Sequence, residues 1–182
     1  MSGTTSSLRA RLVGLLNGSA GVAPWTLASG RFHTVVPELE SVERTAVERG
    51  LTVHIDGRKP MEPVNTLSGY GLFERRVRVR VGYVLTETGD EGTYEASGEQ
   101  SGASTREAIE DRSDEDATEI AAVIGSLRNW ASLTPGVSVI DVMPDVGEAD
   151  ALDLLVDRAI RTLFFRLQSR DALPGTSLGP TL

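Results

Sequence analysis

The fold is decided by residues 71–86, GLFERRVRVRVGYVLT. The side chains of this stretch alternate, which is the pattern of a strand with one buried face. The apolar face contains Phe73, Val77, Val79, Val81, Tyr83 and Leu85. The opposite face carries Arg76, Arg78 and Arg80. We therefore expect a long central strand, with the rest of the chain arranged around it.

The composition is that of an ordinary globular domain, with 182 residues, 40% hydrophobic and 24% charged. The chain has no cysteine, which excludes disulfides, thiolate metal sites and cysteine nucleophiles. We expect no signal peptide, because the first residues, MSGTTSSLRA, lack a basic region followed by an apolar core. No apolar run approaches the roughly 18 residues of a membrane-spanning helix, so we expect no membrane partner.

The net charge of −8 is concentrated in one segment. Residues 87–116 contain eleven acidic residues and two arginines, so this segment carries −9 and the rest of the chain carries +1. A general nucleic-acid binder would carry a basic patch, and the acidic balance argues against that class.

The chain before the central strand is predicted to contain both helices and strands. A helix is expected over residues 6–17, followed by Gly18 at its end. Its apolar face contains Leu8, Leu12, Leu15 and Leu16. Residues 31–36 and 51–55 are predicted as strands. A helix over 37–49 is predicted between them, with Gly50 ending it.

An acidic arm, residues 87–104, follows the central strand. It is rich in glycine and acid and almost lacks apolar residues, so it predicts a mobile loop or an extended hairpin tip. A strand could continue through residues 93–96.

A helix over residues 113–130 is predicted from a strong apolar stripe. Ser113 is expected to cap it, with Asp114, Glu115 and Asp116 in the first turn, where carboxylates meet the positive helix end. The stripe contains Ala117, Ile120, Ala121, Ile124 and Leu127.

The C-terminal part of the chain is expected to complete the sheet. Residues 137–142 predict a strand. Residues 152–167 fit both a helical stripe and an alternating pattern, so we expect a short helical or looped start and a final strand from about Arg158. The predicted class is α+β, with a mostly antiparallel (mixed) sheet of four or five strands, two or three flanking helices and a long acidic loop or hairpin. Residues 1–170 form one domain in this scheme, and residues 171–182 form a flexible tail.

Residue types that carry chemistry are present but form no recognised motif. The chain contains no G-x-x-x-x-G-K, G-x-G-x-x-G or G-x-S-x-G motif. His33 and His54 lie in predicted strands without a nucleophile at a recognised spacing. Asp114, Glu115 and Asp116 could suggest a metal cluster, but adjacent helix positions point about 100° apart and do not converge on one ion. We therefore predict no catalytic residue, no cofactor and no metal.

Four segments together resemble the tail terminator proteins of long-tailed bacteriophages and related tail-like particles. The segments are RRVRVRVGYVL (75–85), DEDATEIAAVIGSLRNW (114–130), GVSVIDVMP (136–144) and RAIRTLFFRLQSR (158–170). The resemblance implies a structural virion protein, made in the host bacterial cytoplasm, that forms a homohexameric ring. Such a ring caps the tail tube, ends its polymerisation and joins it to a head connector or stopper protein. DNA would pass through the lumen without specific binding.

The arginine face and the acidic arm are the candidate interface with the next subunit or the tube. The candidate residues are Arg76, Arg78, Arg80, Glu87, Asp90, Glu91, Tyr94, Glu95 and Glu99. The alternative for the arginines is a solvated face, or salt bridges to acids of the same chain. Two alternative functions remain: a neck or head-completion protein, and a small-molecule-binding or enzymatic domain with both histidines in a cleft.

Overall fold

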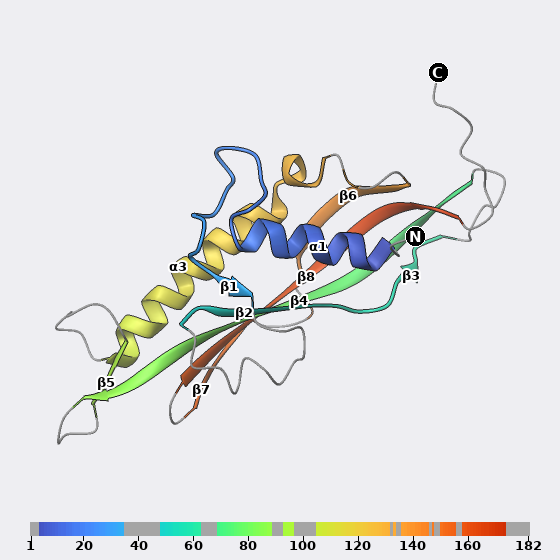
Figure 1. Cartoon of the computed structure of the whole chain (residues 1–182). Helices are drawn as coiled ribbons and strands as arrows, with labels where there is room; N and C mark the ends of the chain where they lie inside the picture. The colour runs from blue at the N-terminus through green and yellow to red at the C-terminus, as the bar shows by residue number, and fades with distance from the viewer. Residues whose placement is uncertain are drawn as a thin grey trace.

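The computed structural model describes residues 4–34, 48–62, 69–88, 93–96, 105–131, 133, 136–145, 147, 150–155 and 158–173. Within these ranges the chain is an α+β domain in which helices pack on one face of a mixed sheet (Figure 1). The helices are α1 (Thr4–Leu16), α3 (Thr105–Gly125) and a short 3-10 helix, η2 (Leu127–Trp130). The strands are β1 (His33–Thr34), β2 (Gly50–Ile55), β3 (Lys59–Pro60), β4 (Tyr70–Thr88), β5 (Thr93–Ala96), β6 (Val137–Pro144), β7 (Ala151–Leu154) and β8 (Arg158–Ala172).

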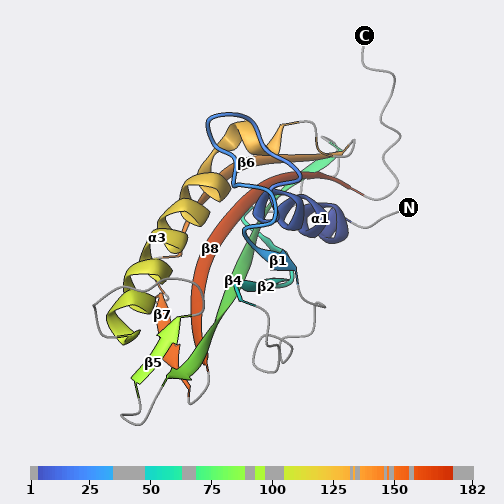
Figure 2. The ribbon, with the colours of Figure 1, turned by 60° about the vertical axis from the view of Figure 1, so that its left-hand side comes forward.

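The sheet is built around β4 and β8, as Figures 1 and 2 show. Its main order is β1-β2-β4-β8-β6, while β3 and β5 pair with β4 and β7 pairs with β8. The β4–β8 ladder is antiparallel and runs from the pair Tyr70 and Ala172 to the pair Val84 and Arg158. β1 is parallel to β2, so the sheet is mixed. The class is as predicted, but the described residues contain eight strands rather than four or five, because short flanking segments pair with the two long strands.

The alternation of the central strand is confirmed wherever its side chains are described. The buried residues on the helix-covered face of β4 include Phe73, Val77, Val79, Val81 and Tyr83. Most of their partners in β8 on the same face are also buried, as in the pair Val79 and Leu163, whereas Arg161 opposite Val81 is half-buried. The core lies between this face and the two α-helices. Burial of one face therefore fixes the register, because a shift of one residue would turn the arginines inward.

The first helix is also confirmed, one turn or less from its predicted bounds. All four leucines of its predicted apolar face are buried in the core. Gly18 ends the helix with φ +74°, and a Cβ added there would lie 2.7 Å from the Ser29 backbone. Only glycine fits this close approach at positive φ without strain.

The helix predicted from Ser113 begins two turns earlier, at Thr105, and its α-helical part ends at Gly125. The prediction that Ser113 caps the helix is therefore wrong. Ser113 is fully buried inside α3, and its Oγ donates to the carbonyl oxygen of Glu110 at 2.9 Å. The apolar stripe in fact extends back to buried Ile109. Because a serine hydroxyl can bond within its own helix, its presence alone does not mark a helix start.

The C-terminal half of the ambiguous stretch forms a strand from Arg158, as predicted. The first half is neither helical nor looped, because Ala151–Leu154 pairs with β8 as β7. The local sequence fits a helical stripe and a strand alternation equally well, and pairing with β8 selects the strand. β8 also continues to Ala172 with Asp171 buried, so the strand extends two residues into the predicted tail. Residues 174–182 lie outside the described part.

The remaining predictions are met in part. The strand over 51–55 is confirmed as β2, which starts one residue earlier, at Gly50. The strand predicted over 31–36 is described for His33–Thr34. The helix predicted over 37–49 falls mainly on residues 35–47, which lie outside the described part of the chain. In the acidic arm, the possible strand over 93–96 is confirmed as β5.

Candidate interaction surface

The three predicted arginines lie on the face of the sheet that the described helices leave open. Arg76 is exposed, while Arg78 and Arg80 are half-buried. In the ladder, Arg78 lies between His54 of β2 and Phe164 of β8. Arg80 lies between Thr52 and Thr162 in the same two strands. The arginines therefore belong to the middle of the sheet and are flanked by strands on both sides.

Arg76 forms an ion pair with an acid of its own chain. Its Nε lies 3.0 Å from Oδ2 of Asp145, whose other oxygen lies 3.4 Å from Nε of Arg166. Arg76 and Arg166 are direct partners in the β4–β8 register, so one carboxylate sits between two facing cations. Asp145 directly follows β6 and is 5% exposed. This ion pair corresponds to the alternative given above, in which the arginines form salt bridges to acids of the same chain. The acid comes from the end of β6 and not from the acidic arm.

The acidic arm begins where β4 passes the end of its pairing with β8. The last residues of β4 pair with β5 in register, with Glu87 opposite Tyr94 and Thr86 opposite Glu95. The predicted residues Asp90, Glu91 and Glu99 lie outside the described residues. Glu87 is seven residues beyond Arg80, about 23 Å along a strand. The arginines and the hairpin are thus two separate surfaces along one strand.

Asp116 links three side chains from separate segments of the chain. It is fully buried and accepts from Nη2 of Arg31 at 2.6 Å and from Nε of Arg49 at 2.8 Å. The hydroxyl of Tyr83 donates to it at 3.0 Å. One carboxylate thus joins α3 to β4 and to the segments beside β1 and β2. The prediction that Asp116 serves the positive end of a helix is wrong, because α3 starts eleven residues earlier.

This cluster changes the acidity of two of its members. Burial raises the pKa of the Tyr83 hydroxyl well above its ordinary value, and the negative charge of Asp116 raises it further. Partial burial alone would lower the pKa of Arg31, but its hydrogen bonds to Glu119 and Asp116 outweigh that effect and the pKa is raised. Both groups therefore keep their protons at neutral pH, with Arg31 charged and Tyr83 neutral.

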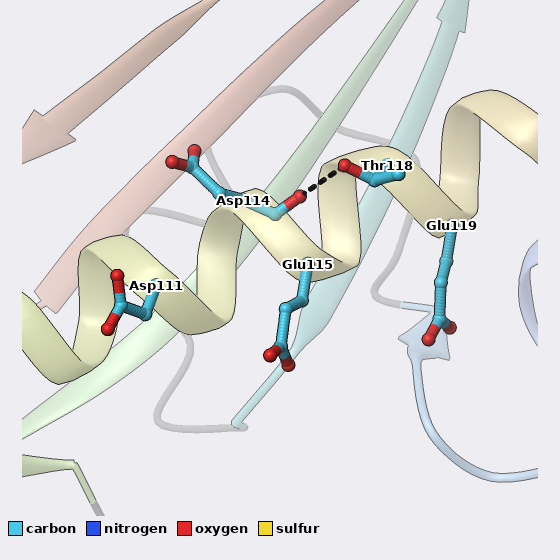
Figure 3. Close-up of a pocket in the computed structure, with 5 residues that line it drawn as sticks. All are labelled: Asp111, Asp114, Glu115, Thr118 and Glu119. Atoms are coloured by element: carbon cyan, nitrogen blue, oxygen red, sulfur yellow. Dashed lines mark hydrogen bonds between the residues drawn. The ribbon is translucent and has the colours of Figure 1, made fainter.

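The outer side of α3 carries a shallow acidic hollow (Figure 3). It is lined by Asp111, Asp114, Glu115, Thr118 and Glu119. In Figure 3, Asp114 points to the opposite side of the helix from Glu115 and Glu119. Asp114 pairs with Arg161 at 2.9 Å, and Glu119 pairs with Arg31. Among the described residues no group of acids and histidines is placed to hold a metal ion.

Arg75 is a buried charged residue that the sequence analysis did not identify. It lies on the apolar face of β4 and is one of the largest fully buried side chains. Its guanidinium donates to Oγ of Ser169 and to Oδ2 of Asp171, and Ser169 Oγ donates to Asp171 Oδ1 at 2.7 Å. The sequence did contain a signal, because Arg75 falls on the same face of the alternation as Phe73 and Val77. An arginine on a buried face requires a buried acid as its partner.

The two histidines are not brought together. His33 is exposed and pairs with Gly50 at the start of β2. His54 lies four residues further along β2, about 13 Å away along the strand, and its Nε2 is 2.8 Å from Asp56. The two imidazoles therefore do not share a cleft between adjacent strands.

Comparison with known proteins assigns no family. No protein-family model matches the chain, and no curated protein matches it. In the described part of the chain, none of the helices is both long and apolar enough to span a membrane.

Proposed function

We propose that this chain is a structural ring subunit of the tail terminator type, which assembles into a homohexamer at the end of a tail tube. The resemblance of four segments to that family motivates the proposal. The α+β class of the structure is compatible with it. In this role the chain would end polymerisation of the tube and provide the surface for a head connector or stopper protein.

The observation that carries the proposal is the continuation of β4 beyond its pairing with β8, which ends at Val84. β4 is a continuous strand of 19 residues, which corresponds to about 60 Å. A usual strand spans about 20 Å. Its far end pairs with the four-residue β5, which lies beside the start of α3 (Figure 2). In the proposed ring, this end of β4 contacts a neighbouring subunit.

The charge distribution supports the same role. The segment that carries −9 starts in this hairpin and continues into α3. If the acidic hairpins lined the lumen of a ring, they would repel the phosphates of DNA and let it pass without sticking. This explains why a protein that surrounds DNA would carry an acidic arm.

The experiment is native mass spectrometry of the purified chain over a range of concentrations, together with tube-end labelling by electron microscopy. A hexameric mass and a ring on one end of isolated tail tubes are the expected results. A chain that stays monomeric and never associates with tube ends overturns the proposal. Binding to a portal-side connector without binding to tube ends would instead assign the chain to the neck.

A further inference from the structure

A small apolar patch is exposed at the end of α3. It consists of Val22, Trp25 and Leu127, which are 43%, 43% and 49% exposed. Val22 and Trp25 belong to the loop after α1, and Leu127 starts η2. Figures 1 and 2 both show that loop beside η2. We call these three residues the Trp25 patch.

The Trp25 patch is held rigid from below by Asn129, which is fully buried. Its Oδ1 accepts from the Val22 amide at 2.7 Å, and its Nδ2 donates to the carbonyl oxygens of Trp25 and Val123 at 2.8 and 2.9 Å. The amide of Trp25 also donates to the carbonyl oxygen of Val22 at 2.9 Å. An exposed tryptophan on a pre-ordered loop loses little entropy on binding, which is the profile of an interface hot spot.

A second exposed apolar pair lies at the tip of the β7–β8 hairpin. Leu154 and Leu155 are 38% and 45% exposed, and the Leu155 amide donates to the carbonyl oxygen of Arg158 at 2.8 Å across the turn. We call this pair the leucine tip. The exposed acids Asp150 and Asp153 precede it in sequence.

The leucine tip and the Trp25 patch are too far apart to meet in one molecule. β8 contacts α3 through the ion pair of Arg161 and Asp114, and the leucine tip lies beyond that point, toward the start of α3. Leu127 lies thirteen residues after Asp114, about 20 Å along a helix. Figure 2 shows the β7 end of the sheet and the loop after α1 at opposite ends.

Charge distinguishes the two surfaces. Arg128 is exposed beside Leu127, and Arg31, in the loop after α1, has the same sign, whereas Asp150 and Asp153 precede the leucine tip and Arg158 lies across its turn. Among the described residues the Trp25 side is therefore cationic and the leucine tip is net acidic, so the two surfaces attract each other. Two complementary but different patches on one chain give a head-to-tail contact, which closes into a ring when the rotation between copies allows it.

We propose that the leucine tip of one copy docks on the Trp25 patch of the next copy. The leucines cover Trp25 at the centre of the contact, and Asp153 faces Arg128 at its rim. This contact specifies how neighbouring subunits of the proposed ring would meet. Its closure into a hexamer rests on the proposed ring function. The docking of one copy on the next depends only on the two surfaces described above.

The first test compares the association of three variants by analytical ultracentrifugation. Trp25→Ala, and separately Leu154→Ser with Leu155→Ser, should each weaken association at least about 30-fold, as expected for a hot spot. Met61→Ser is the matched control, because Met61 is 45% exposed but lies in neither surface. Circular dichroism melts establish that each variant is folded.

The second test uses the head-to-tail geometry. A mixture of the Trp25→Ala copy and the double-serine copy should form a heterodimer that grows no further, because each copy keeps one working surface. Arg128→Asp and Asp153→Arg should each weaken association about fivefold, and a chain with both changes should recover it. If folded Trp25 and leucine variants assemble like the wild type, the contact is wrong although the ring proposal stands. A wild-type chain that remains monomeric in solution overturns the contact, and it overturns the ring proposal as well if it never associates with tube ends.

Discussion

Arg75 and Arg76 are neighbours in β4, yet the pleat places them on opposite faces of the sheet in opposite surroundings. Arg75 and its partner Asp171 are both 0% exposed. Arg76 is 47% exposed, and its partner Asp145 lies at the sheet edge. The same ion-pair chemistry therefore has two different consequences. In the core, each charge depends on its partner, whereas on the open face Arg76 can be hydrated without its partner, although Asp145 is only 5% exposed.

The largest effect is expected for Arg75→Ala. It leaves Asp171 as a buried carboxylate with the hydroxyl of Ser169 as a donor and Arg58 at 3.7 Å as the remaining cation among the described ion pairs, and we expect a loss of about 3–5 kcal/mol in the free energy of unfolding. Urea denaturation of the monomer measures this loss. The control is Arg75→Met combined with Asp171→Leu, which removes both charges and should recover most of the stability. Equal losses in the single and double variants would contradict the role assigned to the pair.

A smaller effect is expected for Asp116→Ala, which removes another fully buried acid. Arg31 and Arg49 are only partly buried and can be hydrated after the change, but the Tyr83 hydroxyl is left without its acceptor. We expect a loss of about 2–3 kcal/mol. Thermal unfolding and urea denaturation measure it. A loss of stability as large as that of Arg75→Ala would mean that hydration of the partly exposed Arg31 and Arg49 does not reduce the cost of losing Asp116.

Tyr83→Phe separates the hydrogen bond from the packing of the ring. At pH 7 we expect a loss of about 1–2 kcal/mol, because the bond to a charged acceptor disappears. Burial and the charge of Asp116 raise the pKa of Tyr83 in the folded state. The wild type should therefore lose stability as the pH rises above about 10, the pKa of an unfolded tyrosine. Denaturation at a series of alkaline pH values should show a shallower loss for Tyr83→Phe, and identical slopes would contradict this assignment.

The smallest effect is expected for Arg76→Ala, the exposed member of the compared pair. Asp145 keeps Arg166 as a partner and Arg76 itself is half exposed, so we expect this ion pair to contribute at most about 1 kcal/mol. Added salt should weaken even this contribution by screening. Urea denaturation at low and high salt tests both statements. A loss close to that of Arg75→Ala would remove the distinction between the two faces.

Local patterns were sufficient for much of the fold and for the placement of the arginine face. The alternation of residues 71–86 and the leucine spacing of α1 both predicted the observed elements, because each pattern records which face is buried. The start of α3 was missed, since the hydroxyl of Ser113 bonds inside the helix as readily as at its end. β7 was missed because residues 151–154 became a strand through pairing with β8.

The candidate surfaces were predictable to different degrees. The arginines of the open face were identified by position, but their ion pairs were not, since Asp145 is far from Arg76 in sequence. The Trp25 patch and the leucine tip carried no motif at all. They emerge only when the exposure of each apolar side chain is known.

The sequence by itself determined the α+β class, the central strand and the concentration of negative charge in one segment. These follow from short-range periodicity and composition, which need no knowledge of distant contacts. Tertiary structure alone decided which acid neutralises which arginine. Asp171 is 96 residues from Arg75, and Asp116 is 85 residues from Arg31. Burial makes such partners obligatory, but only the folded sheet brings them within reach of each other.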